Sequence, residues 1–94
     1  MNFVYILYSI SIDKYYVGET LDIQERIKQH NSGFYDSAYT KQTSDWVLYY
    51  SISCEDRVLA RKIETHIKKM KSKTYIQNLK KYSEITEKLK SKYN

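Results

Sequence analysis

The chain has 94 residues, which is enough for one domain with a modest core and too few for a catalytic unit joined to a separate recognition domain, so we expect residues 1–94 to form a single domain. Cys54 is the single cysteine, so an internal disulfide and the usual multi-cysteine zinc sites are excluded. A single cysteine fits a reducing cytoplasm, and we expect no disulfide-linked partner. The formal net charge of +5 favours an anionic partner.

The charges are divided unevenly along the chain. Residues 1–53 carry 4 basic and 6 acidic side chains, whereas residues 54–94 carry 12 basic and 5 acidic ones. A polyanion such as DNA is therefore expected to approach mainly the C-terminal segment. A lysine-rich helix that is merely solvated produces the same asymmetry, so charge alone leaves both interpretations open.

Two short segments, residues 3–8 and 14–20, are rich in β-branched and aromatic side chains, which predicts two strands joined by a short loop. In the antiparallel hairpin that we expect, Tyr5 lies opposite Tyr16, and side-chain alternation places both hydroxyls on the same face of the sheet. The loop lacks glycine and proline, so its turn type does not determine this register. Gly18 predicts a bulge or the close approach of another backbone or a ligand.

The apolar run at the N-terminus is short. It has no positively charged segment before it and no small-residue cleavage site after it. It is therefore predicted to be neither a signal peptide nor a membrane span, and we expect a cytoplasmic protein that does not associate with membranes.

A helical pattern follows over residues 21–33. Thr20 or Asp22 can cap its N-terminus, and Asn31-Ser32-Gly33 is a typical C-terminal stop.

Two lines of side chains on this helix differ in character. Ile23 and Ile27 are four residues apart and are expected to face the sheet. Arg26 and His30 are also four apart, on a neighbouring line at the border between the buried stripe and solvent. The helix is thus predicted to present a cation and an imidazole beside the two tyrosines.

The rest of the chain predicts a loop, a strand and two helices. Residues 34–45 are polar and are interpreted as a loop, and residues 46–53 predict a third strand. A helix opened by Glu55 and Asp56 has a regular apolar stripe made of Leu59, Ala60, Ile63, Ile67 and Met70. A second C-terminal helix has the stripe Ile76, Leu79, Tyr82, Ile85 and Leu89. This order predicts an α+β domain in which three helices flank a three-stranded antiparallel sheet.

Several polar side chains from different predicted elements are expected on one side of this sheet: Tyr5, Tyr16, Arg26, His30 and Glu64. Two tyrosines beside an arginine suit phosphodiester cleavage, because a phenol can position or deprotonate a water and a guanidinium can hold phosphate oxygens. A phenol titrates near pKa ~10, so a base needs a nearby cation. Glu64 can hold a hard divalent ion through one carboxylate.

The motifs Phe3-Val4-Tyr5 and Tyr16-Val17-Gly18, with residues 30–33 and the helix of Glu64, resemble the GIY-YIG nuclease superfamily. The resemblance covers residues 3 to about 80. It is greatest to the small single-domain branch related to the N-terminal incision domain of the bacterial excision-repair nuclease. Phe3 replaces the glycine of the first family motif, at a position that contributes backbone and packing.

The resemblance implies roles for individual residues. The resemblance implies that Tyr5 and Tyr16 are active-site tyrosines. It also implies that Arg26 is the arginine of the family and that Glu64 is the glutamate that binds the metal. His30 occupies a position where the family often has another polar catalytic residue. Asn78 falls near the place where many members have an asparagine that supports the active site.

These observations predict an endonuclease that uses Mg²⁺ or Mn²⁺ to hydrolyse DNA by water attack. Tyr5 would be the base or water orienter, and the phosphate backbone would be attracted by Lys68, Lys69, Lys71 and Lys73. The alternatives are a catalytically inactive nucleic-acid-binding module of the same fold and a protein-interaction domain. In those alternatives the tyrosines are ordinary strand aromatics and Glu64 pairs with Lys68 four residues later.

Overall fold

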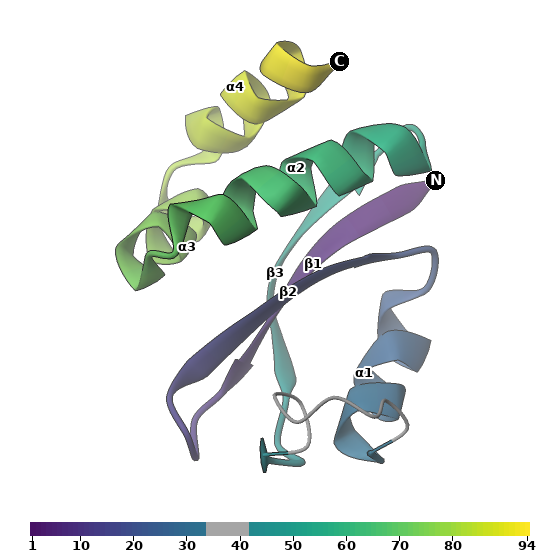
Figure 1. Ribbon diagram of the computed structural model, residues 1–94, viewed down its shortest axis with the longest axis vertical. Coiled ribbons are helices and arrows are strands. Elements are labelled where there is room, and N and C mark those ends of the chain that lie inside the picture. The colour runs from purple at the N-terminus through teal and green to yellow at the C-terminus, as the bar shows by residue number, and fades with distance from the viewer. Residues whose placement is uncertain (34–41) are drawn as a thin grey trace.

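The computed structural model describes residues 1–33 and 42–94 and contains one antiparallel sheet (Figure 1). Its strands are β1 (Asn2–Ser9), β2 (Lys14–Thr20) and β3 (Val47–Cys54), in the order β2-β1-β3. All three predicted strands are confirmed to within a residue or two. Because β1 is central, β2 and β3 form the two edges of the sheet, and most of the predicted loop over residues 34–45 lies outside the described residues.

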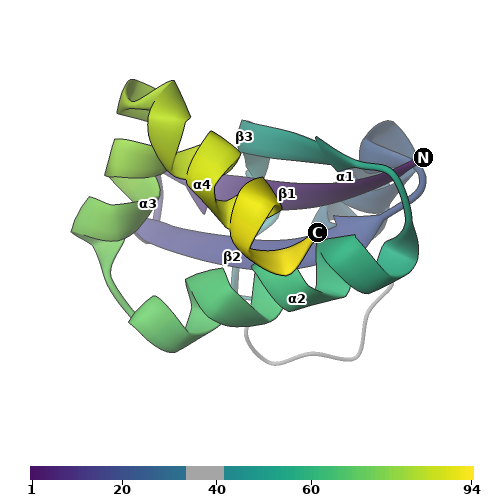
Figure 2. The same cartoon turned by 90° about the horizontal axis from the view of Figure 1, so that it is seen from above.

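Helices cover both faces of the sheet (Figures 1 and 2). Helix α1 (Ile23–Asn31) packs on one face, and α2 (Arg57–Met70), α3 (Lys73–Lys81) and α4 (Ser83–Tyr93) lie on the other. The α+β class is therefore confirmed. No helix in the described part of the chain is long and apolar enough to cross a bilayer.

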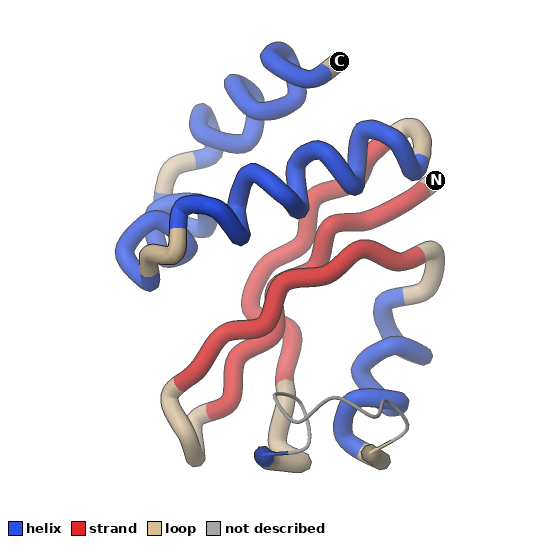
Figure 3. The backbone as a smooth tube through the Cα atoms, in the orientation of Figure 1, coloured by secondary structure: helices blue, strands red, loops and turns tan. Residues whose placement is uncertain are grey.

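The prediction of one last helix is wrong, because the chain turns at Tyr82 and forms two helices there. Tyr82 has extended dihedral angles (φ −123°, ψ 101°) and separates α3 from α4, as the loop between them shows in Figure 3. The turn brings α4 across α2, so that Leu89 and Thr86 become buried while Tyr82 remains 42% exposed.

Side-chain alternation along β1 divides the core into two clusters. Val4 and Ile6 face α2, where its predicted stripe packs as expected except for Met70, which ends the helix 45% exposed. Cys54 is buried in this cluster, which raises the pKa of its thiol. The cluster on the α1 side is smaller. It contains Tyr5 and Leu7 of β1 together with Trp46, and the side chains packed against it include Tyr16, Ile23 and Ile27.

The hairpin register differs by two residues from the prediction. Tyr5 pairs with Gly18 and Tyr16 pairs with Leu7, so the two tyrosines are diagonal neighbours and do not lie directly opposite each other. The turn starts beyond the Ser9–Lys14 pair, which sets this register. Since side chains alternate with a period of two, the shift preserves the face, and the prediction that both phenols share one face is confirmed.

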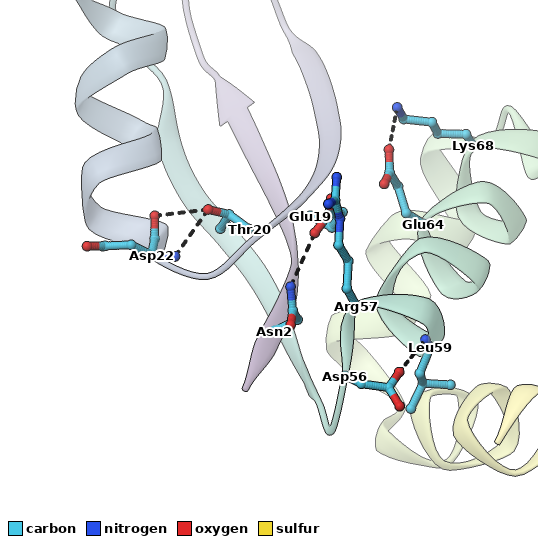
Figure 4. A network of polar contacts seen from close by, with 9 residues as sticks. All are labelled: Asn2, Glu19, Thr20, Asp22, Asp56, Arg57, Leu59, Glu64 and Lys68. Carbon is cyan, nitrogen blue, oxygen red and sulfur yellow. Dashed lines mark hydrogen bonds and ion pairs between the residues drawn. The ribbon is translucent and has the colours of Figure 1, made fainter.

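The junction between β2 and α1 follows the capping prediction. Asp22 is the N-cap residue, and its carboxylate accepts a hydrogen bond from the backbone N–H of Glu25 at 3.1 Å. The Thr20 hydroxyl exchanges hydrogen bonds with the backbone of Asp22 (Figure 4). Gly33 follows the helix with φ +74°, a conformation that favours glycine. These local contacts set the direction in which α1 leaves the sheet.

Candidate active site

The centre of the site is a hydrogen bond between β1 and α1. The Tyr5 hydroxyl lies 2.9 Å from Nε2 of His30, and the two residues are only 1% and 3% exposed. Gly18 leaves the space for this contact, because a Cβ at that position would lie 2.5 Å from the Tyr5 hydroxyl oxygen. The glycine in the second strand thus marks a close approach, as predicted, and the approaching group is a side chain of the neighbouring strand.

Tyr16 completes an aromatic group with these two residues. Its ring centroid lies 6.2 Å from that of Tyr5 and 4.8 Å from that of His30. Tyr16 is half-buried, whereas Tyr5 is enclosed. The phenol of Tyr16 is therefore the one that lies nearer to solvent, and the phenol of Tyr5 lies behind it.

His30 is held in its neutral form. Burial, and then the positive charge of Arg26, lower the pKa of His30 to about 4. The expectation that both residues lie at the border of the buried stripe is correct for Arg26, which is half-buried, and wrong for His30, which is buried. The imidazole turns inward because the Tyr5 hydroxyl satisfies its Nε2.

Glu64 does not share the sheet face of the tyrosines, contrary to the prediction. It lies on α2, which packs against the opposite face. Its carboxylate is 2.7 Å from the Lys68 ammonium, which lies 5.8 Å from the centre of the Tyr16 ring. Because β2 is an edge strand, the two faces meet at its edge, and Lys68 connects Glu64 with Tyr16 there. Figure 4 shows Glu64 and Lys68 extending from α2 on the side of the strands.

Glu64 fits a metal that takes most of its ligands from outside the protein. No cluster of three acidic, histidine or cysteine ligands occurs in residues 1–33 and 42–94. Mg²⁺ is commonly held by one or two carboxylates together with waters and substrate phosphates. The Glu64 side chain is 19% exposed, and its partner Lys68 is more exposed still, so the carboxylate can exchange one cation for another.

The four lysines expected to contact DNA do not form one surface. Lys68, Lys71 and Lys73 surround a pocket beside Tyr16, whereas Lys69 lies in a separate hollow with His66 and Tyr93. Lys69 therefore points to the other side of α2.

Asn78 does not join the rest of the site. It lies on α3, where its backbone carbonyl accepts a hydrogen bond from Tyr82. No hydrogen bond in the described part of the chain connects its side chain with Tyr16 or Glu64.

Asn31, which is not among the predicted site residues, anchors α1 beside the sheet. The Asn31 amide donates to the carbonyl of Trp46 at 2.9 Å, and its oxygen accepts from the Trp46 N–H at 2.8 Å. This double contact joins the end of α1, next to His30, to the residue immediately before β3. Asn31 was interpreted as part of a helix stop, and only the tertiary structure shows what its amide binds.

Comparisons with known proteins identify the family of the chain. The family model of the GIY-YIG catalytic domain matches residues 1–83. The chain is also 35% identical over 79 residues to a UPF0213 protein of Syntrophus aciditrophicus (strain SB), an alignment that covers 84% of this chain and 90% of that protein. No solved structure gives a significant match. The family model covers both tyrosine strands, α1 and α2, and with them every residue of the site, and the chain accordingly belongs to the GIY-YIG family.

Proposed function

We propose that this protein is an endonuclease that hydrolyses DNA phosphodiester bonds by water attack with the help of a divalent metal ion. The observation that carries the proposal is the buried hydrogen bond between Tyr5 and His30, with Tyr16 packed against both and Arg26 close by. Membership in a nuclease family supports nuclease activity in general.

Tyr5 and His30 form the proton-handling part of the site. A neutral imidazole can accept the hydrogen bond of the Tyr5 hydroxyl at Nε2, which directs the phenol oxygen lone pairs away from the histidine. We assign Tyr5 to orient or deprotonate the attacking water, and His30 to assist the proton transfer. Because Tyr5 is buried, this water would be one held inside the site.

Tyr16 and Arg26 form the phosphate-holding part. A phenol and a guanidinium beside each other can donate hydrogen bonds to phosphate oxygens as negative charge builds up in the transition state. The water oxygen would bond to phosphorus while the bond to the 3′ oxygen breaks, which leaves a 5′-phosphate and a 3′-hydroxyl. Tyr16 suits this role because it is the more exposed of the two tyrosines.

Glu64 is the residue proposed to hold Mg²⁺ or Mn²⁺. Such an ion would act as a Lewis acid that stabilises the charge on the scissile phosphate. Glu64 would have to release Lys68 to bind it, and a partly exposed ion pair allows this at little cost in free energy.

Two other functions compete with this one. A non-catalytic nucleic-acid-binding module would use the basic surface alone, and a protein-interaction domain would use neither the basic surface nor the tyrosines. Neither function requires a buried tyrosine and histidine joined by a hydrogen bond, and this contact therefore favours the enzyme.

One panel of substrates separates the three functions. The protein is incubated with single-stranded, duplex and branched DNA, in magnesium or in chelator. Cleavage that requires the metal supports the enzyme, and salt-sensitive binding without cleavage supports the binding module. Neither binding nor cleavage supports the protein-interaction domain.

A further inference from the structure

A pocket of about 530 Å³ opens between the edge strand β2 and the junction of α2 with α3. Its walls are mainly apolar and aromatic, with Tyr15 and Val17 from β2, Ile67 from α2 and Ile76 from α3. This volume lies within the range of known small-molecule sites. The pocket is therefore large enough for a flat ring system and has the apolar walls that such a ring requires.

The rim of this pocket is strongly basic. Lys14, Lys68, Lys71 and Lys73 all belong to it, and no acidic side chain is among the described residues that line it. Two of these lysines also form ion pairs with carboxylates outside the lining, Lys68 with Glu64 and Lys73 with Asp13. An apolar interior inside a cationic rim complements a nucleobase attached to phosphates, since the base can occupy the interior while the phosphates meet the lysines.

The pocket is continuous with the proposed active site. Tyr16 and Lys68 belong to both, and Lys68 contacts Glu64 directly. Glu64 and Lys68 are four residues apart on one side of α2, about 6 Å along the helix axis. Lys71 follows the C-terminal end of this helix and lines the pocket. A DNA strand whose scissile phosphate lies at Tyr16 can therefore place an adjoining nucleotide in the pocket.

We propose that this pocket binds one unstacked nucleobase of the DNA strand next to the phosphate that is cut. The proposal rests on the proposed function and narrows its substrate to DNA with a single-stranded or unpaired nucleotide at the cleavage site. A fully paired duplex would first have to expose a base, and such exposure opposes binding. Tyr15 and Tyr16 provide the aromatic surfaces on which bases of any sequence stack.

The test compares two single strands of five nucleotides in the presence of chelator, so that nothing is cleaved. One is all thymidine, and the other has an abasic residue at its centre and the same number of phosphates. We expect the base to raise affinity about tenfold, and the amide NMR signals of Val17 and Ile76 to shift only with the complete strand. Equal affinity for the two strands, or shifts confined to the hollow around Lys69, would overturn the proposal.

Three variants make the test specific. Ile76→Phe fills the pocket, so the preference for the complete strand should disappear while binding of the abasic strand remains. Lys71→Gly allows the positive φ of 47° at that position and removes one charge from the rim of the pocket. It should therefore weaken the binding of both DNA strands equally. Lys69→Gln is the matched control and should leave the preference unchanged. If Ile76→Phe loses the dispersed NMR spectrum of a folded protein, the Lys71→Gly variant and the comparison of the two DNA strands still test whether the pocket binds a base.

Failure of the pocket and failure of the nuclease give different results. Metal-dependent cleavage without any preference for the complete strand would exclude base binding in the pocket and support the nuclease. A preference for the complete strand without cleavage of any DNA would exclude the nuclease and support base binding in the pocket. A pocket that binds an uncharged extended peptide, and neither DNA strand, would also overturn the assignment.

Discussion

The Tyr5 hydroxyl and Nε2 of His30 lie 2.9 Å apart, although 25 residues separate them in the chain. Both residues are buried, so the hydrogen bond gives a partner to two polar atoms whose removal from water would otherwise be costly in free energy. The contact exists because Gly18 leaves space beside the phenol and Asn31 ties the end of α1 to β3. A change in any of these residues should therefore act on the same hydrogen bond.

Replacing Tyr5 with phenylalanine removes this hydrogen bond and leaves the ring. We expect DNA cleavage to fall by about 10²- to 10⁴-fold. The free energy of unfolding should fall by about 1–3 kcal/mol, because Nε2 of the buried His30 loses this hydrogen bond. Initial cleavage rates and chemical denaturation measure the two effects. Tyr8→Phe is the matched control, because Tyr8 lies on the same strand and donates its hydroxyl to Asp13 outside the site. Full activity of Tyr5→Phe would remove Tyr5 from the mechanism.

Replacing Gly18 with alanine should displace the Tyr5 ring. The new Cβ would lie 2.5 Å from the hydroxyl oxygen, so the ring must move and the contact with His30 is lost. Overpacking of this kind costs about 1–3 kcal/mol, and cleavage should fall at least as far as in Tyr5→Phe.

Gly33→Ala provides a contrast for this variant. It is strained by a φ of +74°, but apart from its chain neighbours the new Cβ meets no atom of the described residues within 4 Å. We expect it to lower stability by about 1 kcal/mol and to leave the cleavage rate unchanged. Equal losses of activity in the two glycine variants would argue against a specific role for Gly18.

Features set by neighbouring residues were predictable from the sequence. The N-cap at Asp22 and the buried stripe of α2 follow from local hydrogen bonds and from helical periodicity. The prediction that Tyr5 and Tyr16 share a face is correct although the predicted register was wrong by two residues, because a shift of two residues leaves every side chain on the same face of the sheet. The resemblance to a nuclease family was carried by these same local motifs and was confirmed.

Features set by tertiary packing were not predictable in the same way. The pattern of α2 shows which of its sides is apolar but not which face of the sheet that side covers, so Glu64 was placed on the wrong face. The apolar pattern continues without interruption past Tyr82, so the sequence does not reveal the turn there. The turn is recognised only from the packing of α4 on α2. His30 was assigned to the helix border because its buried partner, Tyr5, lies on a distant strand.

Replacing Glu64 with alanine should separate metal binding from folding. We expect cleavage to fall by about 100-fold or more, while stability changes by at most about 1 kcal/mol because the pair with Lys68 is partly exposed. The paired control is Lys68→Met, which removes the cation and leaves the carboxylate. That variant should retain metal-dependent cleavage with a higher KM. If Lys68→Met abolishes kcat while Glu64→Ala does not, the lysine and not the carboxylate is the essential group.

The dependence of DNA binding on salt should distinguish the two sides of α2. Each lysine that contacts a phosphate of a single strand contributes about 0.7 to the slope of log affinity against log salt concentration. Lys68→Gln and Lys71→Gly should each reduce the slope by about this amount, because both lysines lie at the pocket beside Tyr16. Lys69→Gln, on the other side, should leave it unchanged. A reduced slope for Lys69→Gln alone would place the DNA in the other hollow.

The pH dependence of stability should report the burial of His30. Its pKa falls from 6.5 to about 4 on folding, so between these pH values the unfolded chain binds a proton that the folded chain does not. The contribution of His30 to the free energy of unfolding should therefore be constant above about pH 6.5 and decrease as the pH falls toward 4, with a slope approaching 1.4 kcal/mol per pH unit.

A His30→Gln variant isolates this contribution. Its amide oxygen can still accept a hydrogen bond from Tyr5 but does not titrate, so the difference in stability between the two proteins should vary with pH only between about 6.5 and 4. His66, whose pKa is also lowered by burial and by Lys92 and Lys69, titrates in both proteins and cancels in the difference. Denaturation curves at half-unit pH steps measure the effect. Parallel stability profiles would mean that His30 takes up its proton as readily in the folded chain as in the unfolded one, and that the imidazole beside Tyr5 is not held neutral.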